Sequence, residues 1–333
     1  MSSLDLSRVT VIVPTYNRAA SLRRCVEALL RCDPGGAQVE LRVSDDGSTD
    51  DTEAVVADLK RAAPPAFRVH YHRGENGGQS AARNRAIAAS DTDVLLFTDD
   101  DCEPDRGWIA AMLRAGWHPG LGAVGGHLVA AARGNRVSRY CRYMRYNEYP
   151  PDDAPPRFVN SANCAYLRSA LVELGGYEQL LPRLVDQDLG RRIALAGYEL
   201  RYQPEARVDH HHRESVRVLA RDYWRRGYSS ILRNVIWDAE LPITPARIRS
   251  ERRTLYRRGA RMLLALPFEV VKLPFQGVAV GDAPLFAYLN WLQWVQGRAG
   301  QIAVMEAILA GEQSTTRTAR VAVAAESAGA ASS

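Results

Sequence analysis

Short apolar runs along the chain alternate with longer segments in which apolar residues recur every three or four positions. The short runs, rich in Val, Ile and Leu, predict strands buried on both faces, and the longer segments predict amphipathic helices. The predicted strands span residues 9–13, 39–43, 67–72, 94–97, 121–129 and 200–208. The helices predicted between them span residues 21–31, 52–61, 80–89 and 189–195. This alternation indicates a mostly parallel sheet with right-handed crossovers.

The last third of the chain differs, because helical periodicity continues there without strand-like runs. Helices are predicted over residues 215–235, 245–266 and 285–309. We therefore expect an α/β domain over residues 1–213 and a helical region over residues 214–310. Residues 311–333 are rich in Ala, Ser and Thr, and we expect them to form a disordered tail.

Three consecutive carboxylates, Asp99, Asp100 and Asp101, follow the apolar run 94–97. Like charges this close repel one another and raise one another's pKa, so a positive partner is needed. A divalent cation is the usual partner, and in an extended segment Asp99 and Asp101 point to the same side. Carboxylate ligands favour Mg²⁺ or Mn²⁺ over softer metals. The alternative is a solvated turn in which Asp105 caps the next helix.

A second acidic pair, Asp45 and Asp46, follows the predicted strand 39–43. The carboxyl ends of parallel strands lie at one edge of the sheet, where ligands of open α/β sheets bind. We therefore expect this pair to lie near Asp99 and Asp101. A turn rich in Asp and Gly is common by itself, so the informative observation is that two such sites occur.

Gly77 and Gly78 precede the predicted helix 80–89, and Arg83 lies near its start. A helix N-terminus behind glycines can hold an anion through its free backbone N–H groups. The segment matches neither G-x-G-x-x-G nor the phosphate loop ending in Gly-Lys-Ser/Thr, which counts against dinucleotide dehydrogenases and P-loop kinases. Taken alone, it is better explained as an ordinary helix cap.

The composition bears on compartment and ligand class. The net charge is +5, and Lys60 and Lys272 are the only lysines. Arginine suits bidentate contact with phosphates, although a generic basic surface fits equally well. The five cysteines lack C-x-x-C spacing, which argues for reduced thiols in the cytoplasm rather than a zinc site. With no signal peptide and no apolar run of ~18 residues, we expect a cytoplasmic protein, soluble or peripheral to the inner face of the membrane.

Four short motifs follow one another in the first part of the chain. They are Pro14-Thr15-Tyr16-Asn17-Arg18, Asp45-Asp46-Gly47-Ser48, the run from Asn76 to Asn84, and Asp99-Asp100-Asp101. Together they resemble the nucleotide-sugar half of a family 2 glycosyltransferase with the GT-A fold. The resemblance extends over residues 9–230 and implies a nucleotide-sugar part near 9–130 and an acceptor part near 131–213.

The resemblance assigns roles to the residues of these motifs. It implies that Pro14, Thr15 and one of Asp45 and Asp46, in the first place Asp45, hold the nucleoside of the donor. It also implies that Asp99 and Asp101 form the D-x-D pair that binds metal and diphosphate. The residues expected at the donor are Pro14, Thr15, Tyr16, Asn17, Arg18, Asp45, Asp46, Gly77, Arg83, Asp99 and Asp100.

Residues 184–193 resemble the family's Glu-Asp-x-Asp-Leu-x-x-Arg block, whose first Asp is the catalytic base of inverting members. That base corresponds to Asp186, and Val185 stands where Glu is usual. The alternative for Asp186 is a structural role as a helix cap. The residues expected on the acceptor side are Asn163, Asp188 and Arg191.

Three consecutive histidines follow the predicted strand 200–208, and imidazole can complete a metal site. His210 and His212 share a face if the chain is extended there. The family often places a His at this point. We therefore expect His210 first and His212 second as a ligand of metal or diphosphate, with a solvated histidine cluster as the alternative.

Arginines recur every three residues from 133 to 145, interleaved with tyrosines. On a helix this spacing gives an Arg stripe beside a Tyr stripe. Two interpretations are possible: a solvated amphipathic helix whose tyrosines pack inward, or a contact with an anionic acceptor or a membrane surface. We favour the first. No module typical of nucleic-acid binding is present, so no nucleic-acid partner is expected.

These observations predict a GT-A fold, a Rossmann-like α/β architecture with a mostly parallel sheet, followed by a helical extension. The predicted enzyme is an inverting glycosyltransferase that moves a sugar from a nucleoside-diphosphate sugar to an acceptor hydroxyl, assisted by Mg²⁺ or Mn²⁺. The acceptor stays open between a small molecule, a glycan and a lipid-linked molecule. A peripheral membrane contact and a homodimer through the C-terminal helices are also open.

Two other functions are weighed against this one. A sugar-1-phosphate nucleotidyltransferase should carry a Gly-rich phosphate loop with Arg or Lys directly after the first strand, but the chain has Pro14-Thr15-Tyr16-Asn17 there. A non-catalytic nucleotide-sugar-binding protein is suggested by Val185.

Overall fold

The computed structural model describes residues 4–131, 134–144, 156–237 and 243–311. The chain divides into two compact units. The first comprises residues 1–132, 147–179 and 185–211, and the second comprises residues 133–146, 180–184 and 212–333. The boundary after residue 211 is close to the predicted end of the α/β domain at 213. Two short segments, 133–146 and 180–184, join the helical unit instead.

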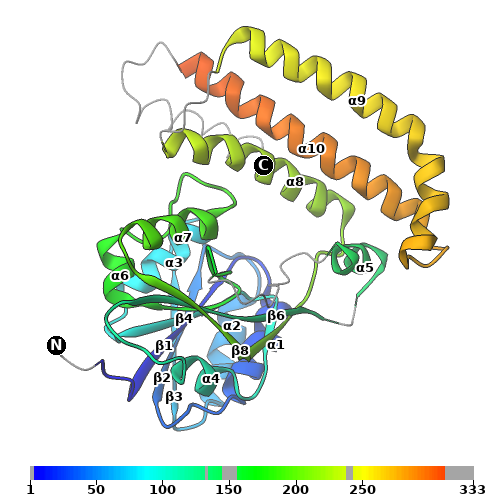
Figure 1. Ribbon diagram of the computed structural model, residues 1–333. Helices are drawn as coiled ribbons and strands as arrows, with labels where there is room; N and C mark the ends of the chain where they lie inside the picture. The colour runs from blue at the N-terminus through cyan, green and yellow to red at the C-terminus, as the bar shows by residue number, and fades with distance from the viewer. Residues whose placement is uncertain (1–3, 132–133, 145–155, 238–242, 312–333) are drawn as a thin grey trace. The chain divides into compact units, whose positions relative to one another are not determined.

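The first unit contains an eight-stranded sheet in the order β3-β2-β1-β4-β7-β6-β8-β5. Figure 1 shows β1 to β4 of this sheet side by side. The strands are β1 (Arg8–Thr15), β2 (Gln38–Asp45), β3 (Phe67–Arg73), β4 (Val94–Thr98), β5 (Cys102–Pro104), β6 (Leu121–Ala130), β7 (Asn163–Leu167) and β8 (Glu199–His210). The first four strands pair in parallel, and so do β6 and β8, whereas β7 and β5 are antiparallel to their neighbours. All six predicted strands are confirmed; β5 and β7 were not predicted.

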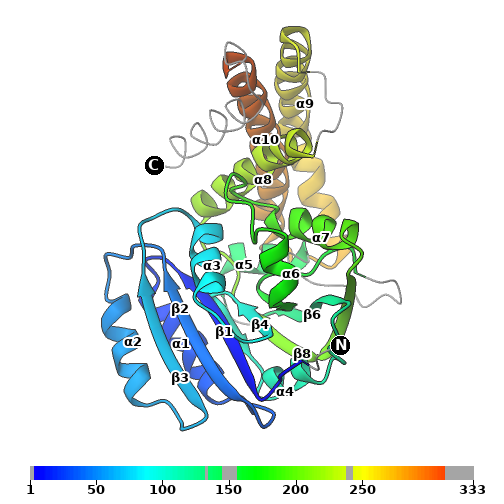
Figure 2. The ribbon, with the colours of Figure 1, turned by 90° about the vertical axis from the view of Figure 1, so that its left-hand side faces the viewer.

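Helices cover both faces of this sheet (Figure 2). One face carries α1 (Ala19–Leu30), α2 (Thr52–Arg61) and α4 (Trp108–Leu113), and the other carries α3 (Gln79–Ala88), α6 (Arg168–Glu173) and α7 (Val185–Leu195). The two-residue period of a strand explains this division. The hydrophobic cluster on the face of α1, α2 and α4 is called the first core cluster, and the cluster on the face of α3, α6 and α7 the second. Val11 and Val13 of β1 belong to the first core cluster, whereas Ile12 between them belongs to the second.

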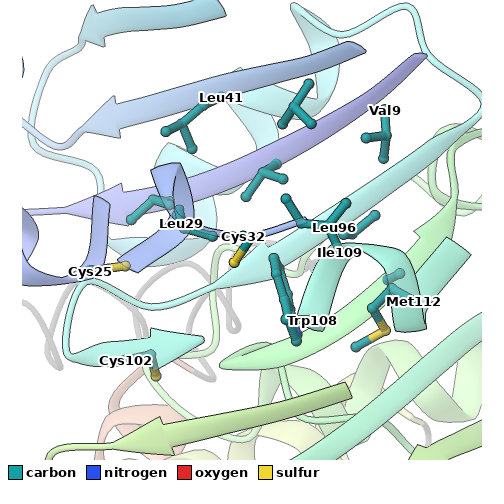
Figure 3. Close-up of a cluster of buried hydrophobic side chains, with 14 of the residues drawn as sticks. Val9, Cys25, Leu29, Cys32, Leu41, Leu96, Cys102, Trp108, Ile109 and Met112 are labelled. Carbon is teal, nitrogen blue, oxygen red and sulfur yellow. The ribbon is translucent and has the colours of Figure 1, made fainter. Parts of the chain in front are cut away.

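The first core cluster is anchored by α4, a helix that was not predicted. Trp108, Ile109 and Met112 of α4 lie in one cluster with Leu96 of β4 (Figure 3). The indole Nε1 of Trp108 donates a 2.8 Å hydrogen bond to Oδ1 of Asn163, so this wholly buried ring leaves no unpaired donor. A six-residue helix shows too few turns for its periodicity to be recognised.

Within its described residues, the second unit contains three long helices and the short α5 (Arg136–Tyr143). The long helices are α8 (Val216–Ile236), α9 (Pro245–Lys272) and α10 (Ala283–Ala310), with the 3₁₀ turn η1 (Leu273–Gln276) after α9. α8 and α10 pack closely through glycine, since a Cβ on Gly227 would lie 1.9 Å from the carbonyl oxygen of Gly297. α9 continues through Pro267 to Lys272, six residues beyond its predicted end at Leu266.

Side chains of the Arg and Tyr stripes of α5 contact other residues of the second unit. Tyr140 is buried against Phe286 and donates a 2.8 Å hydrogen bond to Oδ1 of Asn290. Arg136 and Arg139 form ion pairs with Asp282. These contacts agree with the favoured interpretation, in which the tyrosines pack inward. Four further members of the stripes, Arg133, Arg145, Tyr146 and Tyr149, and most of the predicted tail lie outside the described residues.

Candidate active site

Two of the three carboxylates after β4, Asp100 and Asp101, are buried and form ion pairs with a cation of the chain itself. Nη1 of Arg18 lies 2.6 Å from Oδ1 of Asp100 and 2.9 Å from Oδ2 of Asp101. The hydroxyl of Thr15 donates a 2.8 Å hydrogen bond to Oδ2 of Asp100. Burial raises the pKa of Asp100 to about 6, with a contribution from the charge of Asp101, although Arg18 and Thr15 act in the opposite direction. The predicted need for positive charge at this strand end is therefore met in part by Arg18.

Asp99 is held by the start of α3. Its Oδ1 accepts a 2.6 Å hydrogen bond from Nη2 of Arg83 and a 3.0 Å hydrogen bond from Nε2 of Gln79. The guanidinium of Arg83 is wholly buried and lies 5.1 Å from the centre of the Tyr177 ring. Asn84, the next residue, exchanges two 2.8 Å hydrogen bonds with the backbone of Tyr177. The position of Arg83 is thus fixed by its ion pair with Asp99, by the ring of Tyr177 and by the hydrogen bonds of the neighbouring Asn84.

The second acidic pair links two loops at the same sheet edge. Asp45 accepts hydrogen bonds from Ser48 and from the hydroxyl of Tyr71, the latter at 2.6 Å. Asp46 accepts from the backbone N–H groups of Gly77 and Gly78 and pairs with Arg85. The acidic loop after β2 is therefore joined to the glycine loop through Asp46, a contact that the sequence does not predict.

The loop after β1 closes over this edge. Asn17 adopts a left-handed conformation with φ of 51°, which an Asn tolerates better than most residues. Its Oδ1 accepts a 2.7 Å hydrogen bond from the backbone N–H of Thr49, and its own N–H donates to Ser48. Pro14 is the last but one residue of β1, and Tyr16 is exposed beside Asn17. The predicted donor residues therefore lie on neighbouring loops.

Asp186 is the second residue of α7. Its Oδ1 is buried and has no hydrogen-bond partner among the residues that the structure describes. Burial raises the pKa of Asp186, while the positive charge of Arg83 and hydrogen bonds from Ser161 oppose this shift and the charge of Asp99 adds to it. Val185, which stands where the resemblance predicts a Glu, packs against the second core cluster and makes the surroundings of Asp186 more apolar. A carboxylate with this environment is suited to accept a proton.

In the described part of the first unit, one group of side chains lies close enough together to hold a metal ion: Asp101, Cys102 and His210. Oδ1 of Asp101 lies 3.5 Å from Nε2 of His210, and pairing of β5 with β8 sets Cys102 opposite His210. Burial raises the pKa of the Cys102 thiol well above its ordinary value, which disfavours the thiolate form that a metal ion binds. The carboxylate of Asp101 is a ligand type that suits Mn²⁺ or Mg²⁺, and the imidazole of His210 beside it favours Mn²⁺ over Mg²⁺.

Other predicted residues are placed differently. Asn163 is buried and uses its amide to bind Trp108, His127 and Ala206, which leaves its Nδ2 no hydrogen for an acceptor. Asp188 is buried and pairs with Arg192 at 2.6 Å. Arg191 is exposed, and His212 belongs to the second unit, so their roles stay predictions.

Several contributing residues were not expected from the sequence. Tyr71 and Arg85 bind Asp45 and Asp46, Gln79 binds Asp99, and Ser161 binds Asp186. Gln79 and Arg85 follow the glycines in the chain, so their sequence position offered a signal. Tyr71 depends on the register of β3 against β2, which pairs Val43 with Tyr71.

Comparison with known proteins identifies the class. The model for Glycosyl transferase family 2 matches residues 10–175, and the chain belongs to this family. A solved structure with the same fold is the mannosyltransferase PcManGT from Pyrobaculum calidifontis in complex with GDP-Man and Mn²⁺. It has a TM-score of 0.53 and 19% identity, with 99% of this chain and 83% of that chain covered. The fold of this chain is therefore GT-A.

Curated relatives are similar over part of their length. The pre-mycofactocin glycosyltransferase of Mycobacterium tuberculosis is 32% identical over 221 residues, which cover 63% of this chain and 44% of that protein. The O-antigen chain rhamnosyltransferase RfbN of Salmonella typhimurium is 26% identical over 233 residues, covering 66% of this chain and 71% of that protein. The chain thus spans less than half of the first of these relatives.

No helix within the described ranges is both long and apolar enough to cross a membrane.

Proposed function

We propose that this chain transfers a sugar from a nucleoside-diphosphate sugar to an acceptor hydroxyl, with inversion at the anomeric carbon. The observation that carries the proposal is the position of Arg83. Its buried guanidinium binds Asp99 of the D-x-D segment and acts electrostatically on Asp186, so the predicted diphosphate site and the predicted base share one cation. Family membership and the nucleotide-bound PcManGT structure support this proposal.

The donor would lie along the loops after β1, β2 and β4. Asp45, with Pro14 and Thr15, would bind the nucleoside, and Asp99 with Arg83 would lie beside the diphosphate. Asp101 and His210 would hold Mn²⁺ or Mg²⁺, and the ion would supply positive charge toward the leaving diphosphate. Arg18 already partly neutralises Asp100 and Asp101, which keeps this acidic edge stable before any ligand binds.

Asp186 would take the proton of the acceptor hydroxyl as its oxygen attacks the anomeric carbon. The attack comes from the side opposite the diphosphate, so a single displacement inverts the centre and needs one base and no covalent nucleophile. The unpartnered Oδ1 of Asp186 is the atom that can accept this proton. The acceptor itself stays open between a small molecule, a glycan and a lipid-linked molecule.

A thermal-shift screen of UDP-, GDP- and dTDP-sugars with Mn²⁺ tests donor binding, because a ligand that binds only the folded state raises its stability. With the donor identified, release of nucleoside diphosphate by slow hydrolysis reports turnover without a known acceptor. We expect Asp186→Asn and Asp186→Ala to bind the donor as the wild type does and to lose turnover. The exposed Asp58→Asn is the control and should behave as the wild type.

Two results would count against the proposal. If no nucleoside-diphosphate sugar stabilises the protein with or without metal, the donor is wrong. If both Asp186 variants keep full turnover, this residue is not the base. A wild type that binds the donor but shows neither hydrolysis nor transfer would favour the non-catalytic alternative suggested by Val185.

A further inference from the structure

The surface of α9 in the second unit carries an exposed row of side chains that changes character along its length. We define the α9 ridge as Arg249, Arg253, Arg257, Leu264, Phe268, Val271 and Phe275. Steps of three, four and seven residues keep these positions on one side of a helix. The first three members are basic and the last four are apolar.

The apolar end of the ridge is unusually exposed. Leu264 and Phe268 are each 78% exposed, and Phe275 is 88% exposed. Val280, in the turn that leads to α10, is 76% exposed, so the corner between the two helices is apolar as well. Large side chains that are exposed together, rather than singly, mark an interaction surface.

The basic end of the ridge carries more positive charge than the acidic side chains near it pair with. Arg252 forms an ion pair with Glu306, and Arg298 on α10 forms one with Glu251. In contrast, Arg249, Arg253 and Arg257 are exposed and have no ion-pair partner within the part of the chain that the structure describes. Near the apolar corner, Lys272 lies 4.0 Å from Glu269, its nearest carboxylate.

We infer that the α9 ridge binds the surface of an anionic lipid bilayer. The apolar members would enter the boundary between headgroups and acyl chains, while the arginines would contact lipid phosphates in the plane of the membrane. Basic and apolar groups on one exposed helix match such a surface in charge and in polarity. This inference goes beyond the transfer reaction and does not depend on it.

A second copy of the chain fits the ridge less well. In a two-fold dimer the same patch meets itself. An antiparallel pairing of two ridges would place unpaired arginines on the apolar side chains of the partner. A parallel pairing would place arginine against arginine. Both arrangements desolvate or oppose charges that a phosphate-rich surface would instead neutralise.

Co-sedimentation of the full chain with vesicles tests the inference. One set of vesicles holds equal parts of phosphatidylglycerol and phosphatidylcholine, and the other holds phosphatidylcholine alone. We expect the wild type to bind the anionic vesicles and to be released by salt. The double variant Phe268→Ser/Phe275→Ser should bind at least about tenfold more weakly. Leu195→Ser, an exposed leucine on α7 outside the ridge, is the matched control and should bind normally.

A charge variant separates the two halves of the ridge. Arg253→Gln/Arg257→Gln should weaken binding to anionic vesicles by about fivefold for each arginine and lose most of the salt dependence. Circular dichroism confirms that each variant is folded. The inference is overturned if the wild type does not sediment with anionic vesicles, or if the Phe268→Ser/Phe275→Ser variant binds them as the wild type does. A dimer that the same variant converts to a monomer, without vesicle binding, would assign the ridge to a second copy.

Discussion

Arg83 and Asp99 form a 2.6 Å ion pair in which the guanidinium is wholly buried and the carboxylate is mostly buried. A buried cation next to a strand-end acid is costly unless both groups stay paired, because each has left water. The pair is held by Tyr177 on one side and lies within electrostatic reach of Asp186. Arg83 therefore links the fold of the α3 start to the chemistry proposed at the β4 end.

Arg83→Met should destabilise the first unit and reduce turnover together. Loss of one partner of a buried pair typically lowers the free energy of unfolding by about 3–5 kcal/mol. The exposed pair of Arg61 with Asp58 offers a control, and Arg61→Met should change the same quantity by about 0.5 kcal/mol or less. Urea unfolding of both variants checks this. Equal stability of the two would show that the Arg83 pair adds nothing.

Asp186→Asn should reduce kcat by about 10²–10⁴-fold, the usual contribution of a general base. The wild-type rate should fall in acid, because Asp186 must be ionised to accept a proton. Since burial raises its pKa, this decline should begin at a higher pH than for an ordinary Asp with a pKa of 3.8. A kcat profile against pH checks the prediction, and an acid limb that persists in the Asn variant would assign it to another group.

The same substitution should make the folded state more stable near neutral pH. A carboxyl group whose pKa is raised by folding is costly when ionised, so this cost is present above the raised pKa. It disappears as the pH falls through the raised pKa toward 3.8. Asp186→Asn removes the cost, so its Tm should exceed that of the wild type at neutral pH and approach it in acid. A lower Tm at neutral pH would contradict the shift.

The strands and long helices could be predicted because their signal is local. The apolar run at Val94–Thr98 and the helical pattern of α8 are each complete within one segment of the chain. By contrast, β7 is a strand because Cys164 and Ala165 pair with β4 and β6, and this pairing joins segments far apart in sequence. The predicted end of α9 at Leu266 is too early. The prediction rests on the rule that a proline such as Pro267 breaks a helix, whereas here the helix continues past it.

For the site, the sequence predicts a set of residues but not their contacts. Motif order predicts Arg18, Asp99 and Arg83 as site residues, yet the sequence cannot show that Arg18 pairs with Asp100 and Asp101 or that Arg83 pairs with Asp99. For Asn163, the resemblance predicts a place on the acceptor side. The structure shows in addition that its side-chain amide binds Trp108, which lies on a helix that the sequence does not predict. Such contacts depend on tertiary packing, which periodicity does not record.

His210→Ala should weaken Mn²⁺ binding at least about tenfold, because it removes the imidazole nitrogen that lies 3.5 Å from Oδ1 of Asp101. His211→Ala is the matched control, since the Nε2 of His211 faces Glu103 at 2.8 Å instead. Titration calorimetry with Mn²⁺ and a nucleoside diphosphate measures both. Cys102→Ser should leave the affinity nearly unchanged, and a tenfold loss in that variant would make the thiol a ligand after all.

Asp222→Asn should loosen the second unit. Burial alone would raise the pKa of Asp222, but Arg183 and Arg226 outweigh it and hold this pKa below 3.8. A lowered pKa stabilises the fold above 3.8, and this stabilisation is lost as the pH falls through the lowered value. We expect a cost of about 2 kcal/mol near neutral pH, because Arg226 is partly exposed and solvent weakens its share. Hydrogen exchange of the α8 amides measures this opening free energy. Exchange that is unchanged from that of the wild type, or a difference that grows in acid, would show that the pair does not support the helix.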